Sequence, residues 1–150
     1  MIDWTKRNIT VPSGTHYLPE RVNLDHEAHV VLEAGSELLA KDDVGLFFNA
    51  SNSTLSGPGR IIGGPSCRYV VWFYQADHVR VRDVEIRCEN KLAKYLLCIA
   101  AGSDISVKDC VIAGPRPEGW EKSPSRHDVD SRSPAGITIR TDGEERSVID

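Results

Sequence analysis

The chain has 150 residues, enough for one domain with its own core, and a formal net charge of −4 at pH 7. This negative balance argues against nucleic acid or an anionic membrane as the main partner. No apolar run approaches the roughly 20 residues that a membrane-spanning helix needs. Residues 1–7 contain no signal-peptide core, so the sequence as given predicts a cytoplasmic protein, or an extracellular one if the chain is a fragment.

The four cysteines do not follow the paired spacing of a zinc site. Cys98 and Cys110 fall on predicted strand positions, where a reduced cysteine behaves as a small hydrophobic residue. The same interpretation covers Cys67 and Cys88. We therefore expect buried thiols, no metal site and no cofactor.

The segment from Asn8 to Leu24 opens the predicted fold with a short strand, a turn and two further strands. Its spacing is irregular, as in the terminal units of many repeat proteins. We expect it to cap one end of the core, with Trp4 packed against it.

A repeat becomes visible when residues 77–86 are compared with residues 103–112, which share the same alternation and the same acidic break. Val79 and Val81 recur 26 residues later as Ile105 and Val107. The 26-residue step also links Val81 to Leu55, and a 23-residue step then links Leu55 to Leu32. A second column with a 26-residue step contains Phe47, Phe73 and Ile99.

A fixed period in the twenties that carries short alternating strands is typical of a solenoid. Each predicted coil contains three strands joined by turns, the first full coil running from His29 to about Ala50. The strands are too short for helices and are separated by Gly, Asn and Asp. The predicted fold is an all-β, right-handed, single-stranded parallel β-helix of about four to five coils.

Residues 113–134 interrupt the repeat with prolines and charges and show no apolar periodicity. They predict a long loop excursion, and loops mounted on a rigid stack often carry functional sites. Residues 135–139 return to the stack, and the chain stops within a coil. We therefore expect a single domain, 1–150, truncated at its C-terminal end, whose open last coil self-associates through its uncovered edges.

The stretch Asn52-Ser53-Thr54-Leu55-Ser56-Gly57-Pro58-Gly59-Arg60-Ile61-Ile62-Gly63-Gly64 resembles a corner motif, N-V-T-I-x-G-x-G-x-I-D-G. This motif occurs in polygalacturonase-type glycoside hydrolases of the pectin-lyase-like superfamily. The upstream A-G-S-E-L-L segment is similar to the family's E-x-G-A-x-L, and the order agrees over residues 8 to 140. The resemblance covers the N-terminal part of such an enzyme. It implies a carbohydrate-active β-helix that binds or acts on an acidic or neutral polysaccharide.

Catalysis in that family depends on carboxylates, the first of which lies in an N-T-D-G-I segment. The matching segment here is 133–137, in which Ala135 stands at the position of the aspartate. The family's later motifs would follow Asp150. No catalytic residue of the family can therefore be transferred to this chain, and we expect no release of reducing ends from polygalacturonate.

Within the excursion, His127, Asp128 and Asp130 are the candidate catalytic residues, because a histidine beside carboxylates suits acid–base chemistry. The alternative interpretation is a solvated loop whose charges pair loosely.

Arg80, Arg82 and Lys108 are candidate substrate-binding residues, because strand alternation places them with Ser106 on one face of adjacent coils. Such a basic ladder suits the carboxylates of a polyuronate. The alternative is ordinary surface charge that is paired by Asp83, Glu85 and Asp109.

Trp72 and Tyr74 share their alternation phase with Phe48, opposite to Phe47 and Phe73. If this phase faces outward, the rings form a stacking platform for sugars, and if it faces inward they belong to the core. The sequence therefore favours polysaccharide as the partner. The competing function is a non-catalytic β-helical scaffold, such as an adhesin-like or tail-fibre-like interaction module.

Overall fold

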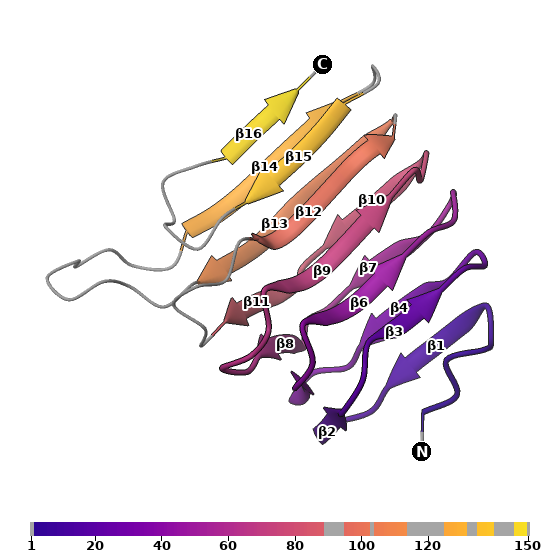
Figure 1. The fold of residues 1–150 in the computed structure, drawn as a ribbon, viewed down its shortest axis with the longest axis vertical. Coiled ribbons are helices and arrows are strands. Elements are labelled where there is room, and N and C mark those ends of the chain that lie inside the picture. The colour runs from indigo at the N-terminus through magenta and orange to yellow at the C-terminus, as the bar shows by residue number, and fades with distance from the viewer. Residues whose placement is uncertain are drawn as a thin grey trace, which may run out of the picture.

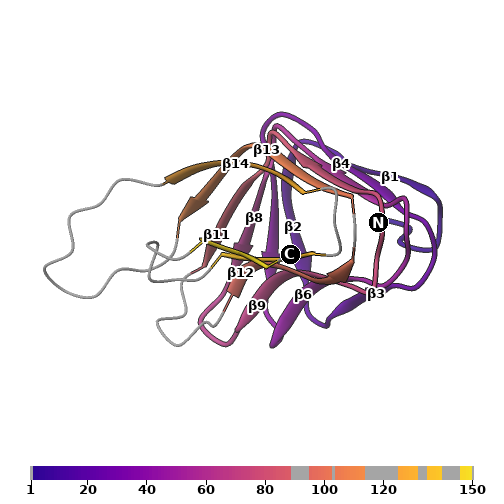
Figure 2. The same ribbon diagram turned by 90° about the horizontal axis from the view of Figure 1, so that it is seen from above.

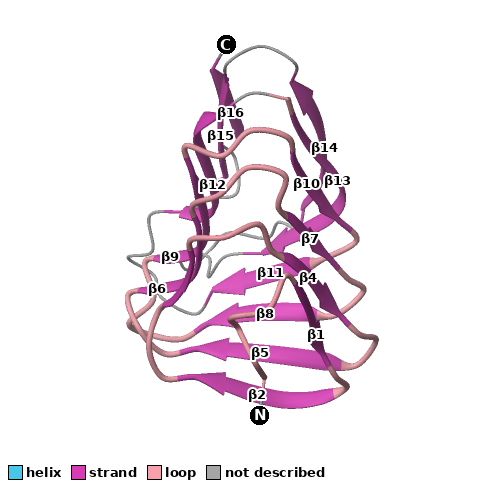
Figure 3. Ribbon diagram, turned by 90° about the vertical axis from the view of Figure 1, so that its right-hand side faces the viewer, coloured by secondary structure: helices cyan, strands magenta, loops and turns pink. Residues whose placement is uncertain are grey.

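The computed structural model describes residues 2–88, 95–102, 104–113, 125–131, 135–139 and 146–149. Every regular element within these residues is a β-strand (Figure 3). The chain winds through about four turns whose strands pair in parallel, so it is a parallel β-solenoid (Figure 1). The predicted all-β fold is confirmed. In the described part of the chain, no helix is long and apolar enough to cross a membrane.

Three faces surround a common interior (Figure 2). The first face contains β1 (Asn8–Val11), β4 (His29–Leu32), β7 (Thr54–Ser56), β10 (Val79–Arg82) and the first part of β13 (Ile105–Ala113). The second face contains β2 (Gly14–Leu18), β5 (Ser36–Ala40), β8 (Arg60–Gly63), β11 (Glu85–Cys88) and the last part of β13. The third face contains β3 (Val22–Leu24), β6 (Val44–Phe48), β9 (Tyr69–Tyr74) and β12 (Tyr95–Gly102).

Strand register confirms the 26-residue repeat in the later coils. Val79 pairs with Ile105 and Val81 with Val107, as predicted. The links from Val81 to Leu55 and from Phe73 to Ile99 are also confirmed. Residues one coil apart therefore occupy equivalent positions from β7 onward on the first face and from β9 onward on the third.

The predicted register is wrong between the second and third coils, because this coil is one residue shorter. Leu55 pairs with Val30 rather than Leu32, a step of 25 residues. Phe73 likewise pairs with Phe48 rather than Phe47. A shift by one residue exchanges the inner and outer sides of a strand. The correction therefore decides which of the two adjacent phenylalanines belongs to the core.

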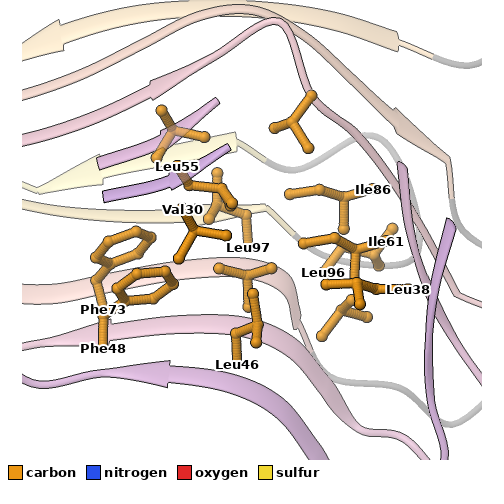
Figure 4. Close-up of a cluster of buried hydrophobic side chains, with 14 of the residues drawn as sticks. Val30, Leu38, Leu46, Phe48, Leu55, Ile61, Phe73, Ile86, Leu96 and Leu97 are labelled. Carbon is orange, nitrogen blue, oxygen red and sulfur yellow. The ribbon is translucent and has the colours of Figure 1, made fainter. Parts of the chain in front are cut away.

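The core is a set of apolar columns, each formed by equivalent inward positions of successive coils (Figure 4). Leu38, Ile61 and Ile86 form one such column on the second face, and all three are fully buried. On the third face, the rings of Phe48 and Phe73 stack with centroids 4.2 Å apart and planes 9° from parallel. Each buried side chain of this size contributes about 1.5–3 kcal/mol.

Polar residues recur at the corners because several corner positions have a left-handed backbone. Asn52, His78 and Asp104 follow one another at 26-residue steps, with φ values of 63°, 56° and 53°. Asp83 and Asp109 form a second pair, with φ values of 56° and 54°. Asn, Asp and His are the non-glycine residues that adopt this conformation most readily. The acidic break in the sequence repeat is therefore a backbone requirement of the corner.

The N-terminal segment forms a complete coil rather than the irregular cap that the sequence predicts. Strands β1, β2 and β3 pair in parallel register with β4, β5 and β6. The expected packing of Trp4 is confirmed, since Trp4 and Ile2 are partly buried against the core.

At the C-terminal end the strands reverse direction. Strand β14 (Ser125–Ser131) pairs antiparallel with β13, β15 (Ala135–Ile139) pairs antiparallel with β12, and β16 (Arg146–Ile149) continues from β15. Part of the predicted loop 113–134 is therefore a strand, whereas 114–124 and 132–134 lie outside the described residues. The expectation that the last coil has uncovered edges is wrong for β12 and β13. Self-association and a single 1–150 domain remain predictions.

All four cysteines are buried, as expected. Burial raises the pKa of the Cys67 thiol to about 12, and the neighbouring Cys88 adds to this shift. The Cys67 Sγ donates a hydrogen bond to the Tyr69 carbonyl at 3.4 Å.

We expect the thiols of the native protein to react slowly with Ellman's reagent at pH 8, because the thiolate is the reactive form and burial suppresses it. Unfolding in guanidinium chloride should expose all four thiols to rapid reaction. The measurement is the absorbance time course with and without denaturant, with glutathione as the exposed-thiol control. Rapid native reaction of Cys67 would contradict its buried position.

Candidate functional site

The residues predicted to bind substrate lie on two different faces of the solenoid. Trp72 and Tyr74 belong to β9 on the third face, whereas Arg80, Arg82 and Lys108 belong to β10 and β13 on the first face. The third face belongs to the six-stranded sheet and the first face to the ten-stranded sheet. The structure therefore does not bring the aromatic and basic candidates together in one site.

Four aromatic side chains gather on the outer side of the third face, and we call Phe47, Tyr69, Trp72 and Tyr74 the aromatic patch. Trp72 occupies its centre. Its ring lies 5.0 Å from that of Tyr69 in a stacked arrangement, with planes 18° apart. The rings of Phe47 and Tyr74 contact it edge-on, at centroid distances of 5.1 and 6.1 Å.

The patch forms because the strands present alternate residues to solvent. Phe47 and Trp72 are register partners on β6 and β9, and both are half-buried. Tyr74 follows on the same side and is 38% exposed. Phe48, which the sequence grouped with Trp72 and Tyr74, is fully buried, so that grouping is wrong. The outward phase of Trp72 and Tyr74 supports the stacking-platform interpretation.

Charged side chains border the patch. The Arg21 guanidinium lies over the Phe47 ring, 5.6 Å from its centroid, in a cation–π contact. Arg68 forms a two-bond ion pair with Asp43, with Nη2 donating to Oδ2 at 3.1 Å. The hydrogen bond from Arg68 lowers the pKa of Asp43 below its ordinary value. Asp43 therefore stays ionised over the physiological pH range and compensates the charge of Arg68.

The basic ladder on the first face has the predicted register, since Arg80 pairs with Ser106 and Arg82 with Lys108. Arg82 and Lys108 are exposed, whereas Ser106 is only 6% exposed, although the sequence predicted it to face outward.

Arg80 takes a different partner from those the sequence suggested. Its Nη2 atom lies 3.1 and 3.0 Å from the two carboxylate oxygens of Asp104, and Nη1 donates to the Asp104 carbonyl at 2.7 Å. His78 Nδ1 lies 2.7 Å from the same carboxylate. Hydrogen bonds from His78 and then Arg80 lower the pKa of Asp104. Asp104 thus compensates the charge of the ladder's first member.

Among the proposed partners of the ladder, Glu85 is engaged on the second face. It forms ion pairs with Arg60 at 3.3 Å and with Arg87 at 3.1 Å.

The candidate catalytic residues His127, Asp128 and Asp130 lie on β14. The backbone places His127 opposite Cys110 and Asp130 opposite Ser106 on β13. The arrangement of their side chains lies outside the described residues, so their catalytic role remains a prediction. Within the described residues, no three His, Cys, Asp or Glu side chains are grouped so that they could hold a metal ion.

Comparisons of the chain with protein-family models, with curated proteins and with solved structures find no match. The polygalacturonase-type resemblance therefore stands on the corner motif and on the solenoid fold alone. The aromatic patch is the feature from which a function is argued below.

Proposed function

We propose that this solenoid is a carbohydrate-binding module whose third face holds a neutral polysaccharide on the aromatic patch. The observation that carries the proposal is the cluster of four aromatic rings on the outer side of a rigid sheet. Sugar rings present flat C–H surfaces, and aromatic faces pack on such surfaces while hydroxyl groups stay in water. Grouped exposed apolar surface on a soluble protein often marks an interaction site.

The strand register supports binding of an extended chain rather than a single sugar. Phe47 and Trp72 come from neighbouring coils, which are about 4.8 Å apart along the solenoid axis. Tyr74 extends the aromatic surface along β9. A linear polymer can therefore contact more than one ring at once, which raises its affinity relative to a monosaccharide.

The charge balance around the patch favours a neutral polymer over a polyuronate. Arg68 is paired with Asp43, and Arg68 together with the weaker influence of Arg21 lowers the pKa of Asp43. The Arg21 backbone amide also donates to the Asp42 carboxylate at 3.2 Å. Each arginine beside the patch thus has a carboxylate nearby, and no net positive field attracts acidic chains.

Replacing Trp72 by alanine is expected to weaken binding of a neutral polysaccharide at least tenfold, because Trp72 contacts all three other rings of the patch. A tenfold loss corresponds to about 1.4 kcal/mol, a usual size for removal of an aromatic stacking surface. Affinity electrophoresis in gels containing galactomannan, hydroxyethylcellulose or polygalacturonate measures the effect.

The matched control is Tyr17→Ala, which removes an aromatic ring that is 59% exposed on the second face. This variant should migrate like the parent protein in every gel. Absence of retardation by all the neutral polymers would overturn the proposal and favour the scaffold interpretation. Retardation by polygalacturonate that disappears in Arg82→Ala would instead assign binding to the first face.

A further inference from the structure

A hydroxyl, an imidazole and a carboxylate form a continuous hydrogen-bonded relay on the outer side of the first face. Thr54 Oγ1 lies 2.9 Å from His29 Nδ1, and His29 Nε2 lies 3.0 Å from Glu27 Oε2. Arg7 Nε lies 3.2 Å from the same carboxylate oxygen. The side chains of His29 and Glu27 are 30% and 31% exposed, so solutes can reach the relay.

The hydrogen-bonding chemistry of neutral His29 assigns the direction of the relay. An ionised carboxylate only accepts hydrogen bonds, so His29 Nε2 carries the proton that points to Glu27. Nδ1 then holds a lone pair and accepts the hydrogen bond of the Thr54 hydroxyl. This is the arrangement in which an imidazole can remove a proton from a hydroxyl group while a carboxylate orients the ring.

The backbone holds the two reacting side chains in place. His29 and Thr54 are register partners on the adjacent parallel strands β4 and β7. The His29 amide donates to the Arg7 carbonyl at 2.7 Å, and the Thr54 amide donates to the Ala28 carbonyl at 3.0 Å. Groups mounted on paired strands keep their relative geometry better than groups on loops.

Arg80 lies on the other side of Thr54 in the same row, as its register partner on β10. The row His29–Thr54–Arg80 thus places the hydroxyl between an imidazole and a guanidinium. Arg80 is held by Asp104, as described above, and is half-buried. A fixed cation beside a nucleophile can stabilise the negative charge that develops on a carbonyl oxygen under attack.

We propose that Thr54, His29 and Glu27 form an acyl-transfer site that cleaves carboxylic esters. Thr54 Oγ1 attacks the carbonyl carbon while its proton passes to His29 Nδ1. The carbon–oxygen bond to the alcohol breaks, and His29 returns the proton to the departing oxygen. Water then attacks the acyl-Thr54 ester with His29 as base, which releases the acid and restores Thr54. This activity is independent of glycan binding on the third face.

The test uses the full chain and p-nitrophenyl acetate, with intact mass and peptide mapping as a second readout. We expect one acetyl group on Thr54 and catalytic release of p-nitrophenolate. Thr54→Val keeps the branched shape of the side chain and should abolish both signals. His29→Gln should slow the acylation by about 10²-fold or more, the usual contribution of a general base. Glu27→Gln should lower the rate while Thr54 is still acetylated.

Two controls separate the relay from background chemistry and from misfolding. Thr10→Val alters an exposed threonine on β1 of the same face and should leave the rate unchanged. Thr54→Ser keeps the hydroxyl and should retain turnover, with circular dichroism matching the parent protein. Acetylation confined to lysines, or equal rates for the parent and Thr54→Val, would overturn the proposal.

Discussion

Replacing Phe48 by alanine is expected to lower the free energy of unfolding by about 3–5 kcal/mol, the usual cost of truncating a buried phenylalanine. Phe48 is fully buried and stacks on Phe73, at a centroid distance of 4.2 Å. Domains of this size are stable by only about 5–15 kcal/mol. The measurement is urea denaturation followed by circular dichroism, and Phe48→Leu supplies a milder variant if the alanine variant fails to fold.

The neighbouring Phe47→Ala is the matched control, because it makes the same change one position away. Phe47 lies on the outer side, where it contacts Trp72 edge-on and the Arg21 guanidinium. Loss of these contacts should cost only about 1 kcal/mol. If Phe47→Ala proves the more damaging change, the 25-residue register between β6 and β9 is wrong.

The difficulty of predicting this register lies in the sequence of β6. In Val44–Phe48, inward and outward residues are both apolar, so alternation does not identify the buried phase. The coils from 77 and 103 show the repeat clearly because Arg, Lys and Asp mark their outer positions. The 26-residue step was therefore visible where outer residues are charged and misleading where the coil is one residue shorter.

The aromatic patch was half visible for a similar reason. Trp72 and Tyr74 are two residues apart, so alternation alone puts them on one side. Tyr69 is three residues from Trp72 and by alternation would lie on the opposite side, yet their rings stack. Val70 and Val71 are both fully buried, so the strand departs from simple alternation between the two aromatics. No sequence signal indicates this local irregularity.

The partner of Arg80 was missed because it comes from a corner rather than from a strand. Asp104 precedes β13 and has a left-handed backbone, with φ of 53°. Its carboxylate thereby reaches Arg80 on the preceding coil. The candidates chosen from the sequence were neighbours along the strands, which is where pairing rules apply. The Thr54–His29–Glu27 relay was likewise hidden, because it depends on the 25-residue step.

Replacing Gly59 by alanine is expected to lower the free energy of unfolding by about 1–3 kcal/mol, the usual cost of overpacking a filled site. A Cβ atom at this position would overlap Ser36 Oγ and lie 2.8 Å from both the Glu33 carbonyl oxygen and Leu32 Cβ. Ser36 is itself buried. The Gly59 amide donates to the Leu32 carbonyl, and the Gly59 carbonyl accepts from the Glu85 amide, so neither neighbouring coil can move away easily.

Gly64→Ala is the matched control, because its added Cβ would meet only the Ala40 carbonyl oxygen, at 3.2 Å. Thermal melts of both variants should show a clearly larger loss for Gly59→Ala. Equal melting temperatures would mean that the second and third coils are not in close contact at this corner. Gly57 faces a similar restriction, since its Cβ would overlap the Asp83 carbonyl oxygen of the next coil. Close packing between coils thus accounts for both glycines of the corner motif, so a solenoid of any lineage can require this motif.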